Sequence, residues 1–296
     1  MRQRSIAVAL AAMLFAMPAF AQALLPGPQG DEVGKNHERI LRIPSADPAV
    51  LMEATEFRPD GNGPFPLVVI NHGSPAGAGE RLIMRRQRYA SSSAWFVSHG
   101  FAVVVPLRRG YGATGGPWKE DYGSCNGPDY FNTGLAAADD IEAAIAYMRQ
   151  QPYVDGKRVI VLGQSAGGWG AMALSSRNPE GVLAFINFAG GRGGYQGGRP
   201  NSNCTPTRLF DAAEKYGKTA RTPALWIYTE NDGFFAPALS RNIHKAFVGA
   251  GGVAEYRLLP PFAEEGHNLF GATDGGVIWQ PLVVSFLGGI RDLEFK

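Results

Sequence analysis

Short apolar runs alternate with helical stretches along most of this chain. The runs at 66–71, 101–107 and 158–162 contain few polar side chains, which is typical of strands buried on both faces. Two similar runs follow at 182–189 and 224–229. Between and after them, the spacing of apolar residues predicts helices over 80–99, 134–151, 165–178, 207–216, 235–248 and 277–287. This alternation predicts an α/β fold with a mainly parallel central sheet and helices on both faces.

The remaining pattern completes the predicted domain. Residues 37–44 and 52–59 alternate and predict two early antiparallel strands, and 254–259 predicts a last strand. Residues 22–36 are rich in Pro and Gly and predict an irregular arm. We see no second core, repeat or low-complexity linker, so the sequence predicts a single α/β domain over 22–296. Two long loops are expected in it, at 108–133 and 190–222, and loops of this length are often functional.

The N-terminus has the pattern of a secretory signal peptide over residues 1–21. A basic start is followed by an apolar run at 6–17, and Ala19-Phe20-Ala21 fits the rule for cleavage sites. The alternatives are an uncleaved anchor or a buried helix, but the run is short for a bilayer span. We therefore expect a periplasmic or secreted mature chain that begins at Gln22 and has no membrane anchor after cleavage.

Charge and cysteine content narrow the class further. The chain has 28 Lys and Arg against 26 Asp and Glu, and residues 1–21 carry two of the arginines, so 28 − 2 = 26 basic residues remain. A net charge of zero gives no reason to expect a nucleic-acid partner. Cys125 and Cys204 are the two cysteines, and an exported chain favours a disulfide between them. Two cysteines without neighbouring His or Cys ligands do not indicate a metal site.

The clearest chemical motif is Gly163-Gln164-Ser165-Ala166-Gly167, which follows a predicted strand and opens a predicted helix. A G-x-S-x-G sequence in this context is the nucleophile elbow, where a serine stands on a sharp turn clear of the sheet. Glycines are needed around it because side chains there would collide with neighbouring backbone. Ser165 is therefore the candidate nucleophile.

A serine hydroxyl needs a base, and the base needs an orienting acid. Of the five histidines, His267 alone lies on a late loop after both the serine and the acids that follow a strand. Asp232, just past the predicted strand 224–229, is the preferred acid, because a short side chain suits that position. The less favoured carboxylates are Glu230, Asp211 and Asp274.

Two backbone N–H groups are expected to form an oxyanion hole. The first is that of Ala166, directly after the nucleophile, and the second comes from the loop after the first parallel strand. That loop contains Gly73 and Ser74, of which Ser74 is the preferred donor. We expect His72 to order this loop and not to act as a base.

Together these segments resemble the α/β-hydrolase superfamily over roughly residues 50–290. The matching pieces, in family order, are NHG at 71–73, GQSAGG at 163–168, YTEND at 228–232 and EGH at 265–267. The loop RRGYGATGG at 108–116 is similar to that of the dienelactone-hydrolase-like and prolyl-oligopeptidase-like branches. Dienelactone hydrolase itself uses a cysteine nucleophile, whereas this chain has Ser165. Prolyl oligopeptidases carry a large propeller domain, for which this chain has no room.

Several residues are candidates for substrate binding. Arg109, with Arg108, is placed to bind a substrate carboxylate, or alternatively pins its loop to an acidic neighbour. Trp169, Phe234 and Phe235 flank catalytic positions and are candidates for an acyl pocket, although core packing explains Trp169 equally well. Trp118 and Tyr122 extend this set from the first long loop. A disulfide between Cys125 and Cys204 would join the two long loops, which would then form a fixed rim over Ser165.

These residues predict a serine esterase that acts on a small or medium ester through an acyl-enzyme and needs no metal or organic cofactor. The alternative is a peptidase or amidase with the same triad, for which the acidic pair Glu264-Glu265 is a weak candidate anchor for a peptide amine. A third hypothesis is a binding module without catalysis, but such proteins usually lose part of the triad. The sequence does not specify an oligomeric state.

Overall fold

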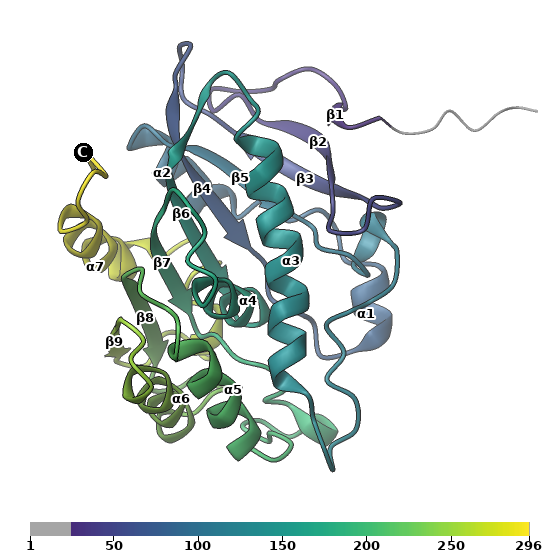
Figure 1. Cartoon of the computed structure of the whole chain (residues 1–296), viewed down its shortest axis with the longest axis vertical. Coiled ribbons are helices and arrows are strands. Elements are labelled where there is room, and N and C mark those ends of the chain that lie inside the picture. Colours follow the sequence, from purple (N-terminus) through teal and green to yellow (C-terminus); the bar gives the residue numbers. More distant parts are fainter. Residues whose placement is uncertain (1–24, 296) are drawn as a thin grey trace, which may run out of the picture.

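The computed structural model describes residues 25–295, through which one nine-stranded sheet runs in the order β1-β2-β3-β5-β4-β6-β7-β8-β9 (Figure 1). Its strands are β1 (Gly27–Pro28), β2 (Arg39–Pro44), β3 (Leu51–Phe57), β4 (Phe65–Asn71), β5 (Ala102–Pro106), β6 (Val154–Gln164), β7 (Val182–Phe188), β8 (Ala224–Thr229) and β9 (Ala254–Leu259). β4 to β9 are parallel to one another, while β1, β2 and β3 extend the sheet in antiparallel pairs. The predicted α/β fold and the early antiparallel pair are confirmed.

The strand order places a switch point at β4. The chain runs from β4 outward to β5 on one side, then returns to pair β6 with the other side of β4 and continues to β9. In open α/β sheets, ligands bind at the carboxyl ends of the strands beside such a point. The loop that follows β4 and the serine that follows β6 therefore meet at the edge where a site is expected.

In the described part of the chain, seven α-helices pack on the two faces of this sheet, with one hydrophobic core on each face. The helices are α1 (Ala78–Leu82), α2 (Ala90–Ser98), α3 (Tyr130–Met148), α4 (Ala166–Ser175), α5 (Thr207–Gly217), α6 (Pro237–Gly249) and α7 (Gly276–Gly288). Residues of α3, α4, α5 and α6 fill the core on one face, and residues of α2 and α7 fill the other. Figure 1 views the face that α3 and α4 cover.

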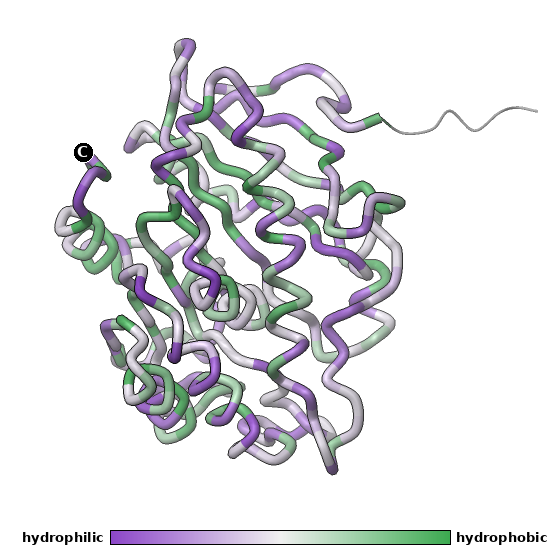
Figure 2. Tube along the Cα trace, viewed as in Figure 1, coloured by the Kyte–Doolittle hydropathy of each residue, from purple (hydrophilic) through white to green (hydrophobic). Residues whose placement is uncertain are grey.

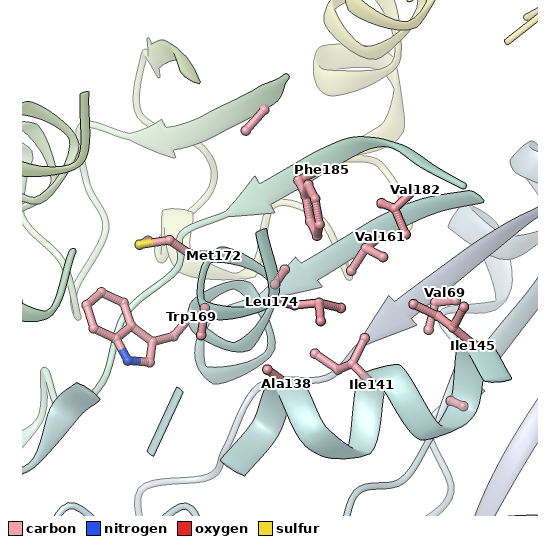
Figure 3. Close-up of a cluster of buried hydrophobic side chains, with 14 of the residues drawn as sticks. Val69, Ala138, Ile141, Ile145, Val161, Trp169, Met172, Leu174, Val182 and Phe185 are labelled. Carbon is pink, nitrogen blue, oxygen red and sulfur yellow. The ribbon is translucent and has the colours of Figure 1, made fainter. Parts of the chain in front are cut away.

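Successive residues of the buried strands supply the two cores in turn. Val69 and Val161 pack under α3 and α4 beside Ile141 and Leu174, as Figure 3 shows. Their strand neighbours, such as Ile70, enter the other core. Because both faces are buried, the central parts of these strands are mainly apolar, and they appear as green stretches in Figure 2.

The predicted helix over 80–99 is wrong, because two short helices, α1 and α2, occupy this stretch with a non-helical segment between them. Within that segment, Thr55 Oγ1 of β3 donates a hydrogen bond to the carbonyl of Gln87 at 2.6 Å. Tyr89 then adopts a left-handed backbone with φ 43°. A contact with a distant strand thus overrides the local helical spacing.

The first long loop and the N-terminal arm also differ from the prediction. The first long loop ends at Asp129 and not at 133, because the Asp129 side chain accepts a hydrogen bond from Asn132 N–H at 3.0 Å and starts α3 four residues earlier than expected. The arm at 22–36 contains the two-residue strand β1. The expected disulfide between Cys125 and Cys204 is present and joins the two long loops.

The predicted signal peptide, residues 1–21, lies outside the described residues. Within residues 25–295, no helix combines the length and the apolar character that a membrane span requires.

Candidate active site

Ser165 occupies a sharp turn between β6 and α4. Its backbone has φ 55° and ψ −120°, a conformation that costs a non-glycine residue free energy and that clusters at functional sites. Ser165 N–H donates to the Phe188 carbonyl at 2.9 Å, and its own carbonyl accepts from Trp169 and Gly191 N–H, so the turn is held on both sides. The predicted strand–turn–helix context of this serine is confirmed.

The glycines of the motif are required by close backbone approach. A Cβ on Gly163 would collide with the backbone of Gly167, and one on Gly167 would collide with the Asn71 carbonyl. A Cβ on Gly73 would lie 3.1 Å from the Ser165 Cβ, so the loop after β4 passes directly against the serine. This contact places the two predicted oxyanion segments beside each other.

His267 and Asp232 form a buried pair. His267 Nδ1 lies 3.1 Å from Asp232 Oδ1 and 3.2 Å from Oδ2, and both residues are less than a tenth exposed. Phe234 and Phe235 N–H donate to Asp232 Oδ1 at 2.8 and 2.9 Å, which fixes the carboxylate. Glu230, Asp211 and Asp274 are all exposed. Of the four carboxylates weighed from the sequence, only Asp232 has a hydrogen bond to His267.

The loop that carries His267 is also fixed from two other directions. Glu265 Oε1 accepts from the N–H groups of His267 and Gly233 at 2.9 and 2.8 Å. Gln164 Nε2 donates to the His267 carbonyl at 2.9 Å, and Tyr89 OH donates to Gln164 Oε1 at 3.0 Å. Sequence reasoning missed Gln164 and Tyr89 in this role. The position of Gln164 directly before the serine was the one available signal.

His72 orders the loop after β4, as expected. Its Nε2 accepts from Arg108 N–H at 3.1 Å, so its Nδ1 carries the proton and donates to the Gly73 carbonyl at 2.7 Å. Burial, together with the positive charge of Arg108, lowers the pKa of His72 to about 3. A histidine that stays neutral and has both nitrogens engaged has no free position to act as a base.

Arg109 supports the alternative of a structural arginine. Its Nε lies 2.7 Å from Asp140 Oδ1 in an ion pair that is almost fully buried, and it lines neither cavity beside Ser165. Arg108 is fully buried and paired with Glu120 at 2.5 Å. Both guanidinium groups therefore hold their loop in place and are not free to bind a substrate carboxylate.

Glu120 is shared by two arginines. Its carboxylate binds Arg108 and Arg192 and accepts a hydrogen bond from Tyr111 OH at 2.9 Å. Although burial opposes its charge, Arg108 and Arg192 keep the pKa of Glu120 below its ordinary value. This buried cluster joins the two long loops behind the serine, and sequence reasoning did not single out Glu120 or Arg192.

Two cavities open beside Ser165. The first, here called the aromatic cavity, has a volume of about 210 Å³ and is lined by Ser74, Pro75, Ala76, Trp118, Asp121, Tyr122, Gly123, Ser165, Ala166, Gly191, Arg192, Gly193, Tyr195, Gln196 and Phe234. The second, the histidine cavity, has a volume of about 500 Å³ and is lined by Gly73, Ser74, Pro75, Ala76, Glu80, Met84, Tyr89, Gln164, Ser165, Phe234, His267 and Asn268. Ser165 is therefore accessible from both.

The predicted pocket residues fall into two groups. Phe234 lines both cavities and stacks on the His267 ring, with centroids 4.2 Å apart, and Trp118 and Tyr122 line the aromatic cavity. Trp169, by contrast, is fully buried among core residues (Figure 3), and its Nε1 donates to the Tyr130 carbonyl at 2.8 Å. Phe235 is also fully buried and lines neither cavity.

Solved structures of known proteins share this architecture. A dienelactone hydrolase-like protein of Klebsiella pneumoniae, described as putative, superposes with a TM-score of 0.55 at 16% identity, over 83% of this chain and 96% of that one. An acylaminoacyl peptidase of Pyrococcus horikoshii gives a TM-score of 0.62 at 16% identity, over 89% of this chain and 43% of that one. The architecture is that of the α/β-hydrolases.

Sequence comparison identifies the family. Residues 52–270 match the dienelactone hydrolase family, and the chain belongs to it. Dipeptidyl-peptidase 5 of Porphyromonas gingivalis is 29% identical over 135 residues, which are 44% of this chain and 18% of that protein. The chain thus spans less than a fifth of that peptidase. The protein is a hydrolase by family, and the fold alone does not specify the bond it cleaves.

Proposed function

We propose that this protein is a serine hydrolase that cleaves carboxylic esters through an acyl-enzyme intermediate, with Ser165, His267 and Asp232 as its triad. The observation that carries this proposal is the strained turn of Ser165 beside His267, which lines the same cavity and is paired with the buried Asp232. Nucleophile, base and orienting acid at one edge of the sheet are what acyl transfer needs.

The first step is attack of Ser165 Oγ on the ester carbonyl carbon. His267 Nε2 takes the hydroxyl proton and passes it to the leaving alcohol, while Asp232 holds Nδ1 and stabilises the imidazolium. Water, activated by the same histidine, then cleaves the acyl-enzyme and releases the acid. Stacking of Phe234 on His267 limits rotation of the imidazole ring.

The N–H groups of Ala166 and Ser74 would hold the oxyanion. The Gly73 carbonyl accepts a hydrogen bond from His72 Nδ1 at 2.7 Å. In a trans peptide the carbonyl and the following N–H point in opposite directions, so the Ser74 N–H points away from His72. Ser74 also lines both cavities with Ser165, which favours it over Gly73 as the second donor.

Peptide hydrolysis is the second candidate, because the relatives include a dipeptidyl-peptidase and an acylaminoacyl peptidase. A peptidase would need an anchor for a peptide terminus. Glu265 is occupied by two backbone N–H groups and Glu264 is exposed, so neither carboxylate provides a built amine site. The small volume of the aromatic cavity favours a compact acyl group over an extended peptide.

Export remains part of the proposal. The disulfide between Cys125 and Cys204 supports an oxidising compartment, in agreement with the predicted signal peptide, and we propose a periplasmic or secreted location.

The test is hydrolysis of 4-nitrophenyl acetate, butyrate and octanoate by the mature protein and by Ser165→Ala. We expect activity that falls by several orders of magnitude in the variant. A matched 4-nitroanilide series separates esterase from peptidase: faster amide than ester turnover would favour the second candidate. Unchanged ester activity in Ser165→Ala, or failure of a fluorophosphonate to label Ser165, would refute the mechanism.

A further inference from the structure

The two cavities beside Ser165 contain different parts of the proposed catalytic machinery, and this inference rests on the proposed function. His267 lines the histidine cavity but not the aromatic cavity, whereas Ala166 lines only the aromatic cavity. The group that leaves must be near the histidine that protonates it. The aromatic cavity, on the side of the proposed oxyanion donor Ala166, is therefore the place for the acyl group.

Four aromatic side chains form walls of this cavity: Trp118, Tyr122, Tyr195 and Phe234. Tyr195 packs on Phe234 with ring centroids 5.2 Å apart, and Tyr122 packs on Tyr130 at the same separation. Arg81 lies over the Trp118 ring at 4.0 Å. Each ring is thus held by a neighbour outside the cavity or in its wall. An aromatic guest gains from offset or edge contacts with such rings beyond the area it buries.

The disulfide holds this arrangement together. Cys125 lies three residues after Tyr122 in the first long loop. Cys204 lies in the second long loop, which also carries Tyr195. Thr205 Oγ1 also donates to the Cys125 carbonyl at 3.2 Å. Loops that are tied covalently lose less conformational freedom when a ligand binds, so the walls are partly preorganised.

The size and charge of the cavity match one neutral ring. A cavity of about 150 Å³ is known to accept benzene, and the aromatic cavity has about 210 Å³. The charged side chains in its wall, Arg192 and Asp121, have opposite signs, so they give an ionic group no clear advantage.

We propose that the aromatic cavity is an acyl subsite for a single aromatic ring, so that the preferred substrates are esters of compact aromatic acids. Tyr195 and Tyr122 are its specificity-determining residues. A saturated ring of equal size has no π face, and a short alkyl chain leaves the walls uncovered, so both should be poorer acyl groups.

The experiment compares kcat/KM for 4-nitrophenyl benzoate, cyclohexanecarboxylate and acetate, which share one leaving group. We expect benzoate to exceed cyclohexanecarboxylate by severalfold, up to about tenfold, since one aromatic contact is worth up to roughly that factor. Tyr195→Leu should reduce this ratio severalfold. Tyr256→Leu, a matched control on β9 that lines neither cavity, should leave the ratio unchanged.

Two results would overturn the subsite, and each is distinct from failure of the proposed function. Equal rates for the benzoate and cyclohexane esters in the native protein would overturn it, and so would a ratio that Tyr195→Leu does not alter. If Ser165 is labelled by a fluorophosphonate but no ester is turned over, relative labelling by phenyl and cyclohexyl phosphonates decides the question. Failure of any probe to label Ser165 would remove the proposed function and the subsite together.

Discussion

Replacement of Glu120 by Gln should destabilise the protein strongly. The Glu120 carboxylate is 3% exposed and lies between Arg108, which is fully buried, and Arg192, which is 5% exposed. Gln has nearly the same shape but removes the only negative charge of this trio and turns one acceptor into a donor that faces two guanidinium groups. Two buried positive charges would then remain without a counter-charge inside the cluster.

The magnitude follows from burial. Removal of one partner from a buried ion pair typically costs about 3–5 kcal/mol, because the other charge is left uncompensated. A loss of about 3 kcal/mol corresponds to a fall in Tm of roughly 6–12 °C for a chain of about this size. Arg192 also lines the aromatic cavity, so ester hydrolysis should fall as well, even in the fraction that stays folded.

The assay is urea unfolding of oxidised native protein and Glu120→Gln, followed by circular dichroism and checked for reversibility. The matched control is Asp155→Asn, which breaks the partly exposed pair between Asp155 and Arg158 at 2.7 Å and should cost less than about 1 kcal/mol. A loss in Glu120→Gln no larger than in this control would refute the reasoning that the cluster depends on its single carboxylate.

Three further results are expected. Because the folded pKa of His72, about 3, lies below its unfolded value near 6.5, only the unfolded state binds this proton between those values; stability should fall by up to about 1.4 kcal/mol per unit as pH drops through this window, and urea titrations should show a shallower slope in His72→Gln. Gln164→Leu removes the hydrogen bond to the His267 carbonyl, so kcat should drop roughly tenfold or more with little change in KM, and a drop confined to KM would contradict a positioning role. Cys125 and Cys204 are 79 residues apart, so replacement of both by Ser should lower the free energy of unfolding by roughly 4 kcal/mol through loop-closure entropy. Unchanged stability and activity would argue against a disulfide that holds the two long loops together.

Much of the sheet and of the candidate site could be predicted because their signals are local. The apolar runs of β4, β5, β6, β7 and β8 reflect burial on both faces, which most residues of these strands share. The elbow around Ser165 needs glycines within a few residues of the serine, so the motif can be recognised from a short stretch of sequence. Chain order then led to Asp232 and His267, which the structure brings within hydrogen-bonding distance.

The break between α1 and α2 could not be predicted in this way. The spacing of apolar residues over 80–99 is typical of a helix. In the structure, however, Thr55 Oγ1 on β3 donates a hydrogen bond to the Gln87 carbonyl. The local sequence pattern does not indicate a hydrogen bond to a distant strand. The consequence matters for the site, because the turn at Tyr89 directs its hydroxyl to Gln164 and thereby to the loop of His267.

The sequence by itself determined the buried strands, the turn of Ser165 and the residue types of the proposed triad, because periodicity and glycine requirements act between neighbours along the chain. Only the tertiary structure decided which charged and polar groups are free to meet a substrate. Arg109 is paired with Asp140, and Arg192 with Glu120, which lies 72 residues earlier in the chain; the sequence shows neither pairing. Which charged side chains pair depends on which distant segments the fold packs together. Because an unpaired buried charge is strongly destabilising, each buried charge must have such a partner and is then not free to bind a substrate.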